Sequence, residues 1–233
     1  MKRFRDRFDA GRRLGEALAE SVGREDVLVL GLPRGGIPVA YEVARRLAAP
    51  LDVFLVRKLG MPGHEELAMG AIASGGVRVL NDEVVHGLGV SADVIEAVAD
   101  VERAELERRE RVYRGARPPP AVMGRTVVLV DDGFATGSTM RAAARALRVK
   151  RPARLILAAP VGAPDTCASL RMEADEVVCL IVPSAFRAVG LWYDDFDQTS
   201  DDEVRSLLER ARAGGGTSGQ TAGTEETGTT DLP

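Results

Sequence analysis

Five short stretches, apolar over most of their length, constrain the fold of this chain more strongly than any other feature. They cover residues 27–32, 52–56, 126–132, 154–162 and 176–182. The segments between several of them repeat apolar residues at helical spacing. Because side chains alternate along a strand, a fully apolar strand must be covered on both faces, as in a parallel sheet between helices. The sequence therefore predicts an α/β fold with a mostly parallel sheet and helices on both faces.

The same pattern predicts the domain organisation. Helices are expected at 9–22, 38–49, 91–114, 136–150, 164–171 and 201–212. We expect one domain over 1–212, with 91–114 as an inserted helix capped by Ser91 and 183–198 as a small hood. Residues 57–76 are rich in glycine and charge and predict a long loop, with short strands near 71–73 and 77–80. Residues 213–233 lack apolar periodicity and predict a disordered tail.

Charge and composition argue against several classes of function. The net charge is −4, so whole-protein electrostatics favour neither nucleic acid nor a membrane surface as a partner. Arginines of the 91–114 helix stand four residues after glutamates, which favours a solvated, self-paired face over an RNA-binding one. The pairs are Glu105 with Arg109, Glu107 with Arg111 and Glu110 with Arg114. No run approaches the ~18 apolar residues of a membrane span, and the N-terminus lacks a signal-peptide core, so we expect a cytoplasmic protein.

The cysteines and histidines indicate no metal cluster. Cys167 and Cys179 lie too far apart for a CxxC motif, and a reducing compartment would leave them as small buried apolar groups. His64 and His86 are the chain's only histidines, too few for a typical zinc cluster.

The stretch VVLVDDGFATGST, residues 127–139, indicates a ligand site. Its strand delivers Asp131 and Asp132 to the carboxyl edge of the sheet, where ligands of such folds bind. The following loop enters a helix near Gly137, and unpaired N–H groups at a helix N-terminus attract phosphate. Carboxylates beside a phosphate suit sugar hydroxyls or a hydrated divalent cation. The pattern therefore predicts a sugar phosphate as ligand.

Simpler interpretations explain less of this stretch. A strand-end turn with Thr136 as a helix N-cap would account for one aspartate and one threonine, but not for the doubled acid or the run GST. A Walker A loop would have lysine where Ser138 stands. No G-x-G-x-x-G dinucleotide fingerprint is present in either glycine loop.

Three segments in sequence order resemble type I phosphoribosyltransferases. VVLVDDGFATGSTM resembles their phosphoribosyl pyrophosphate (PRPP) motif. GLPRGGIPVAYEVARRL, residues 31–47, resembles the pyrophosphate loop with its helix, and DVFLVRKLGMPG, residues 52–63, resembles the next strand and the start of the lid. Together they cover about half of the chain. The resemblance implies the type I phosphoribosyltransferase fold with a lid loop and a hood.

The resemblance also implies roles for individual residues. Asp131 and Asp132 would hold the ribose 2′ and 3′ hydroxyls and, through bound water, a magnesium ion. Arg34 would bind pyrophosphate together with Lys58, and these four residues are the candidate catalytic set. The candidate substrate-binding residues are Gly35, Gly36, Arg57, Gly133, Ala135, Thr136, Gly137, Ser138, Thr139 and Phe186.

The implied reaction transfers the phosphoribosyl group from PRPP to a nitrogenous base and releases pyrophosphate, with Mg²⁺ as cofactor and a cationic ribose ring in the transition state. PRPP and the base would be the partners, and the family commonly forms homodimers. A purine or related base is expected, in nucleotide metabolism such as purine salvage. A second hypothesis keeps the site but makes the protein a non-catalytic regulator that senses PRPP or a nucleotide. The lid cations Arg57 and Lys58 favour the enzyme.

The acceptor base is left open by the sequence. The hood segment PSAFRAVGLWYDDF, residues 183–196, resembles the purine-stacking segment of hypoxanthine phosphoribosyltransferases, so Phe186 is a candidate base platform with Trp192 or Tyr193 nearby. Ordinary core or dimer packing is the alternative for these aromatics. Ala135 stands where hypoxanthine and guanine enzymes usually carry aspartate, which argues against a 6-oxopurine. In the lid, Glu65 and Glu66 would assist proton transfer, or His64, Glu65 and Glu66 would form a solvent-facing loop.

Overall fold

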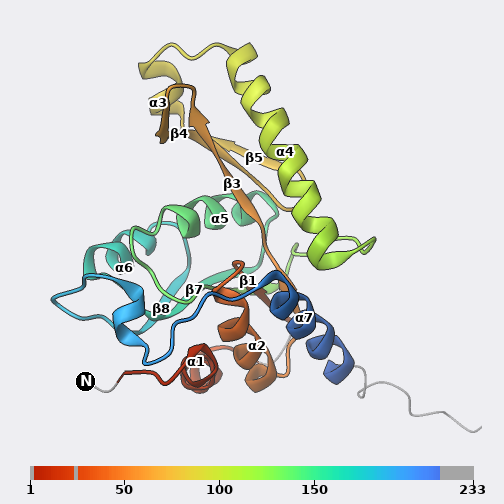
Figure 1. Ribbon diagram of the computed structural model, residues 1–233, viewed down its shortest axis with the longest axis vertical. Coiled ribbons are helices and arrows are strands. Elements are labelled where there is room, and N and C mark those ends of the chain that lie inside the picture. Colours follow the sequence, from red (N-terminus) through yellow and green to blue (C-terminus); the bar gives the residue numbers. More distant parts are fainter. Residues whose placement is uncertain (1–2, 24–25, 216–233) are drawn as a thin grey trace, which may run out of the picture.

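The chain folds into a large and a small sheet surrounded by helices (Figure 1). The computed structural model describes residues 3–23 and 26–215. The strands are β1 (Val27–Gly31), β2 (Leu51–Val53), β3 (Val56–Met61), β4 (His64–Ala73), β5 (Val77–Leu80), β6 (Thr126–Val130), β7 (Arg154–Val161) and β8 (Glu176–Ile181). The helices are α1 (Arg7–Ser21), α2 (Gly36–Leu47), α3 (Asp82–Gly87), α4 (Ala92–Arg114), α5 (Ser138–Val149), α6 (Pro164–Leu170), η1 (Val189–Trp192) and α7 (Asp201–Gly215).

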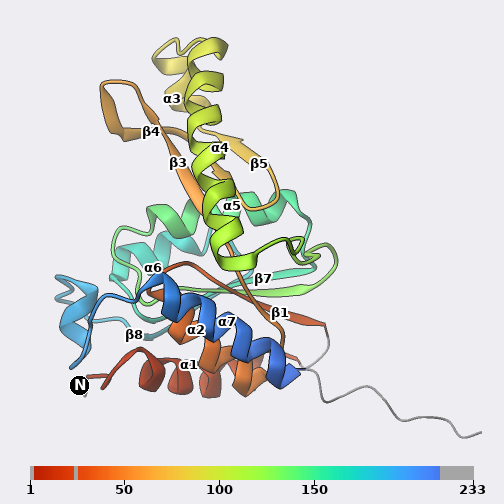
Figure 2. The ribbon, with the colours of Figure 1, turned by 45° about the vertical axis from the view of Figure 1, so that its right-hand side comes forward.

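The large sheet is parallel throughout, in the order β2, β1, β6, β7, β8. β1 pairs with β6 along its whole length, beginning with Val27 opposite Thr126. Val27 and Val29 pack against α1, α2 and α7, whereas Leu28 and Leu30 pack against α5 and α6. Figures 1 and 2 show the two helix layers on opposite sides of this sheet. The predicted α/β architecture is confirmed, and the two-sided burial explains why the central strands are apolar over most of their length.

The small sheet replaces most of the long loop expected at 57–76. β3, β4 and β5 pair antiparallel in that order, and the sheet packs against α4 and α5 (Figure 2). The short strands expected near 71–73 and 77–80 are present, as the end of β4 and as β5. The loop prediction was wrong because Gly63, at φ +79°, closes a tight turn that a sequence pattern does not distinguish from a loop. The pairing also shifts register around Gly60, which breaks the alternation expected of a strand.

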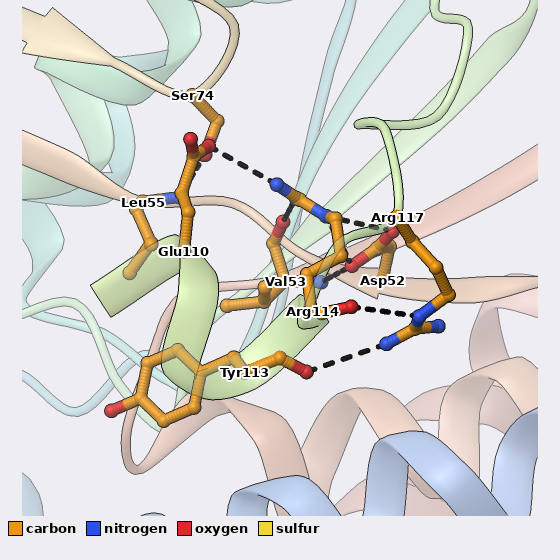
Figure 3. A network of polar contacts seen from close by, with 8 residues as sticks. All are labelled: Asp52, Val53, Leu55, Ser74, Glu110, Tyr113, Arg114 and Arg117. Carbon is orange, nitrogen blue, oxygen red and sulfur yellow. Dashed lines mark hydrogen bonds and ion pairs between the residues drawn. The ribbon is translucent and has the colours of Figure 1, made fainter. Parts of the chain in front are cut away.

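Helix α4 begins as expected and ends in an unexpected anchor. Its N-cap Ser91 accepts a hydrogen bond from the backbone of Val94, and the three predicted glutamate–arginine pairs all form. The helix is not merely a solvated insertion, because Arg114 at its end is buried. As Figure 3 shows, the Arg114 guanidinium donates to the backbone oxygen of Val53 at 2.8 Å and to the carboxylates of Glu110 and Asp52. Arg114 therefore fixes α4 to the edge of the large sheet.

The final helix runs slightly further than expected. α7 extends to Gly215, so residues 213–215 are helical rather than part of a disordered tail. The rest of the predicted tail, 216–233, lies outside the described residues. Within the described part of the chain, no helix is long and apolar enough to cross a membrane.

Candidate functional site

The acid pair lies at the carboxyl end of β6, where β6 delivers it to the edge of the sheet. The Asp131 carboxylate accepts a hydrogen bond from the backbone N–H of Asp132 at 2.9 Å. The Asp132 carboxylate accepts one from the Arg7 guanidinium, also at 2.9 Å. Both aspartates are half-buried. The pair is therefore held in a fixed orientation, with one carboxylate paired to a cation of α1.

Beside the pair, the loop into α5 surrounds a cavity of about 140 Å³. Asp131 and residues 133–140 line it. Gly137 has a left-handed backbone, φ +70°, and directly precedes α5. The Thr166 hydroxyl of α6 donates to the backbone oxygen of Ala135 at 2.6 Å and supports the loop from behind. An open cavity at a helix N-terminus, with Ser138 and Thr139 among its lining hydroxyls, suits a phosphate group.

The loop between β1 and α2 packs directly against the acid pair. A Cβ atom at Gly35 would overlap the carboxylate of Asp132, and one at Gly36 would lie 2.8 Å from the backbone oxygen of Val130. The peptide bond between Pro33 and Arg34 is cis. The two glycines thus let this loop approach the strand end that carries the acids, and two of the three segments singled out by sequence meet at one edge.

Gly35→Ala should lower the rate of the reaction that uses the acid pair by about 10²-fold while leaving the protein folded. The added methyl group must displace the Asp132 carboxylate, and the loss of one preorganised contact typically costs a factor of this size. Steady-state kinetics measure the effect, and circular dichroism checks the fold. Gly23→Ala is the matched control, because a Cβ atom there meets nothing within 4 Å. Equal activity of the two variants would contradict the predicted close packing.

Burial shifts both carboxyl groups of the acid pair toward their protonated forms. Burial, followed by the charge of Asp132, raises the pKa of Asp131 well above its usual value. Burial also raises the pKa of Asp132, although the Arg7 guanidinium acts in the opposite direction. Such a site favours a ligand that brings a cation or several hydroxyl donors.

The comparisons with known proteins agree with this geometry. The family model for phosphoribosyl transferase domains matches residues 2–195. The chain belongs to this phosphoribosyl transferase family. Two Mycobacterium tuberculosis proteins, from strains CDC 1551 and H37Rv, are named provisionally as phosphoribosyl transferases; each is 52% identical over 211 residues. That alignment covers 91% of this chain and 47% of theirs, so the chain spans about half the length of these relatives.

Two further proteins resemble this chain. The solved structure of TT1426 from Thermus thermophilus is 47% identical and superimposes with a TM-score of 0.82, covering 89% of this chain and 98% of that one. The bifunctional protein PyrR of Roseiflexus sp. RS-1 is 36% identical over 123 residues, which are 52% of this chain and 61% of PyrR. The fold of this chain is therefore shared with TT1426 over 89% of this chain and 98% of TT1426.

The segment 183–198, the predicted hood, supports the acid pair through Tyr193 and Phe196. The buried Tyr193 donates its hydroxyl to the backbone oxygen of Asp132 at 2.6 Å. The guanidinium carbon of Arg7 stands 3.9 Å from the centre of the Phe196 ring. Trp192 and Phe186 are half-buried and pack against the small cluster around Tyr193. For Trp192 and Tyr193 these contacts favour the packing alternative, and the role of Phe186 as a base platform stays a prediction.

An arginine-lined cavity next to the loop between β1 and α2 could not be predicted from the sequence. Its volume is about 200 Å³, and its lining includes Arg34 of the loop, Arg108 and Arg109 of α4, and Asp201. Glu105 pairs with both α4 arginines, and these hydrogen bonds hold the pKa of Glu105 at about 2. The sequence gives the Glu105–Arg109 pair but no sign that α4 lies beside Arg34.

The two predicted lid cations, Arg57 and Lys58, line different cavities. The Arg57 guanidinium contacts the Glu102 carboxylate of α4 at 2.5 Å. Lys58 is exposed and lines a cavity of about 190 Å³ between the small sheet and α5, together with Ser138 and Arg141. His64 is exposed at the start of β4, and the side chains of Glu65 and Glu66 lie outside what the structure describes. Lys58 thus shares a cavity with Ser138, whereas Arg57 pairs with α4 and lines a smaller cavity with Pro33 and Thr139.

Proposed function

We propose that this chain transfers the phosphoribosyl group of PRPP to a nitrogenous base, with Mg²⁺, and releases pyrophosphate. The observation that carries the proposal is the meeting of three parts at one sheet edge: the acid pair, the cavity at the N-terminus of α5, and the glycine loop of Arg34. Each part suits one portion of PRPP, namely the ribose hydroxyls, the 5′-phosphate and the pyrophosphate.

In the reaction, the bond from the anomeric carbon to pyrophosphate breaks and a bond to the base nitrogen forms, while that nitrogen loses its proton. Asp131 and Asp132 accept hydrogen bonds from the ribose hydroxyls and face a ring that gains positive charge. The residues at the N-terminus of α5 fix the 5′-phosphate. Arg34 stabilises the departing pyrophosphate. Catalysis then comes from positioning and electrostatics, so the proposal needs no side-chain nucleophile.

The residues present fit a magnesium ion brought in with PRPP. No three histidine, cysteine, aspartate or glutamate side chains among residues 3–23 and 26–215 are grouped to hold a metal by themselves. Mg²⁺ is usually bound by one or two carboxylates, substrate phosphates and water, and the acid pair offers two carboxyl groups side by side. Asp131 and Asp132 would hold the ion through water, and the ion would neutralise charge on pyrophosphate.

Pyrophosphate release tests the proposal. The protein is incubated with PRPP and Mg²⁺ and with each of a panel of purines and pyrimidines. Release that requires one base supports the transfer and names the acceptor. Tight PRPP binding with no release for any base would overturn the transfer and favour the PRPP-sensing regulator. Release at the same rate with and without every base would show hydrolysis instead.

Arg109→Gln should raise the KM for PRPP about 10-fold. Arg109 lines the cavity beside Arg34 and also a small neighbouring one with Pro33 and Thr139, so its charge lies next to the proposed pyrophosphate position. A charge-assisted hydrogen bond contributes about 1.5–3 kcal/mol, which corresponds to at least this factor. Arg111→Gln is the control, because Arg111 is on the same helix with its side chain 69% exposed. Equal KM values for both variants would exclude α4 from the pyrophosphate site.

A further inference from the structure

The only two cysteines of the sequence meet in the structure. Cys167 lies on α6 and Cys179 on β8, and their sulfur atoms are 2.8 Å apart. Both are free thiols. A disulfide bond is about 2.05 Å long, so the sulfurs need to approach by less than ~1 Å to form one. The proposed transfer uses neither thiol, so it does not explain why the two sulfurs are in contact.

The pair lies directly behind the phosphate loop. Gly162 leaves room for both sulfurs, because a Cβ atom there would overlap the Cys167 sulfur and lie 3.2 Å from the Cys179 sulfur. The same Cβ atom would stand 3.3 Å from the Cβ of Phe134, which belongs to the loop. Gly162 and Phe134 also form a backbone bridge. One residue thus separates the thiols from the loop that lines the phosphate cavity.

A second connection runs through the neighbour of Cys167. The Thr166 hydroxyl donates to the backbone oxygen of Ala135, and its methyl group occupies the space that a Cβ at Gly137 would need. Any constraint on the position of Cys167 therefore also constrains the residue that supports the loop from behind.

The two thiols differ in their surroundings. The two sulfurs share a hydrogen bond in which either thiol can donate, and this contact lowers the pKa of Cys167 and raises that of Cys179. Arg171 adds to the lowering at Cys167. Because the thiolate is the form that reacts with oxidants, Cys167 is the more reactive partner. Cys167 is buried, so only a small oxidant reaches it without local opening.

We propose that Cys167 and Cys179 form a redox-active thiol pair, which hydrogen peroxide oxidises to a reversible disulfide behind the phosphate loop. Cys167 attacks one peroxide oxygen and becomes a sulfenic acid as hydroxide leaves and takes up a proton to form water. Cys179 then attacks the sulfenic sulfur, its proton leaves with the departing hydroxyl as a second water, and the disulfide closes. The two thiols lose two electrons in total to one peroxide. The bond ties α6 to β8 and restrains the loop.

Peptide mapping after peroxide treatment tests the pair. Arg171 lies between the cysteines, so trypsin places them on separate peptides unless the sulfurs are joined. We expect a linked peptide pair within one chain, two thiols lost per chain, and full recovery with dithiothreitol. Two free thiols after excess peroxide, or linkage only between chains, would overturn the proposal.

Single variants test the order of events. In Cys179→Ser, the sulfenic acid should persist at Cys167 and react with dimedone, whereas in Cys167→Ser the remaining thiol should stay reduced at the same peroxide concentration. Equal dimedone labelling of the two variants would contradict the assigned roles. Hydrogen exchange of the amides at 134–139 should slow on oxidation of the wild-type protein, and unchanged exchange would exclude coupling to the loop. None of these readouts requires phosphoribosyl transfer, so they succeed or fail independently of the proposed function.

Discussion

Asp131→Asn should lower PRPP-dependent turnover by about 10²-fold and at the same time raise the melting temperature of the ligand-free protein by about 2–4 °C. The two effects have one cause. Burial and the neighbouring charge of Asp132 disfavour the ionised form of Asp131, while a ligand with hydroxyl donors and a cation requires that form. Asparagine carries no charge, so it removes both the repulsion with Asp132 and the carboxylate that the ligand requires.

The pH dependence of the melting temperature has a definite sign. A carboxyl group whose pKa is raised by folding favours the folded state most when it is protonated, and this stabilisation is lost as the pH rises through the folded pKa. The melting temperature of the ligand-free wild type should therefore fall, relative to that of Asp131→Asn, as the pH rises from the usual carboxyl pKa to the raised pKa of Asp131. Above that pKa the difference between the two proteins should stay constant. Thermal melts across a pH series measure both.

Two further variants separate the acid pair from general charge effects. Asp132→Asn should also lower turnover sharply without unfolding the protein, but it weakens the contact with Arg7 and should stabilise less than Asp131→Asn. Glu209→Gln, at an exposed position of α7, is the control and should leave turnover and melting temperature unchanged. Near wild-type turnover of Asp131→Asn would contradict the role of the pair, and a drop in its melting temperature would contradict the repulsion.

Arg114→Met should destabilise the protein by about 3–5 kcal/mol. The guanidinium of Arg114 is buried and donates hydrogen bonds to Asp52, Glu110 and the backbone oxygen of Val53, as shown in Figure 3. Methionine keeps much of the volume but leaves the carboxylate of Asp52 and the carbonyl of Val53 without this donor. Urea unfolding followed by circular dichroism gives the free energy of unfolding.

The control for this anchor is another arginine of the same helix. Arg111 is exposed and its contact with Glu107 is 4.0 Å long, so Arg111→Met should change stability by less than about 0.5 kcal/mol. If the two variants lost the same stability, the Arg114 network would not be the anchor of α4. Because α4 carries Arg108 and Arg109, we also expect Arg114→Met to weaken PRPP binding.

The large sheet could be predicted from sequence because its strands are apolar over most of their length and its central strands are buried on both faces. The acid pair and the glycine loops were equally visible, since their residues are contiguous and the carboxyl ends of parallel strands share one edge. The small sheet was not, because the register shift near Gly60 and the turn at Gly63 disrupt the alternation that identifies strands.

Contacts between distant residues were the other part that sequence could not give. Arg7 and Asp132 are 125 positions apart, and no local pattern connects them. The same holds for Arg114 with Asp52 and for Arg34 with α4, since each depends on how two elements pack. The meeting of Cys167 and Cys179 follows from the pairing of β7 with β8 and the position of α6, which only the structure supplies.

The most direct test of the account is calorimetric titration of PRPP with Mg²⁺ into the wild-type protein and into Gly137→Ala. Gly137 has a left-handed backbone, and a Cβ atom there would stand 2.6 Å from the Thr166 methyl group, so the variant must distort the phosphate loop. We predict saturable binding of one PRPP per chain to the wild type and at least ~10²-fold weaker binding to the variant. No heat with the wild type at millimolar PRPP, or equal binding of PRPP by both proteins, would contradict the proposed binding of PRPP at this loop.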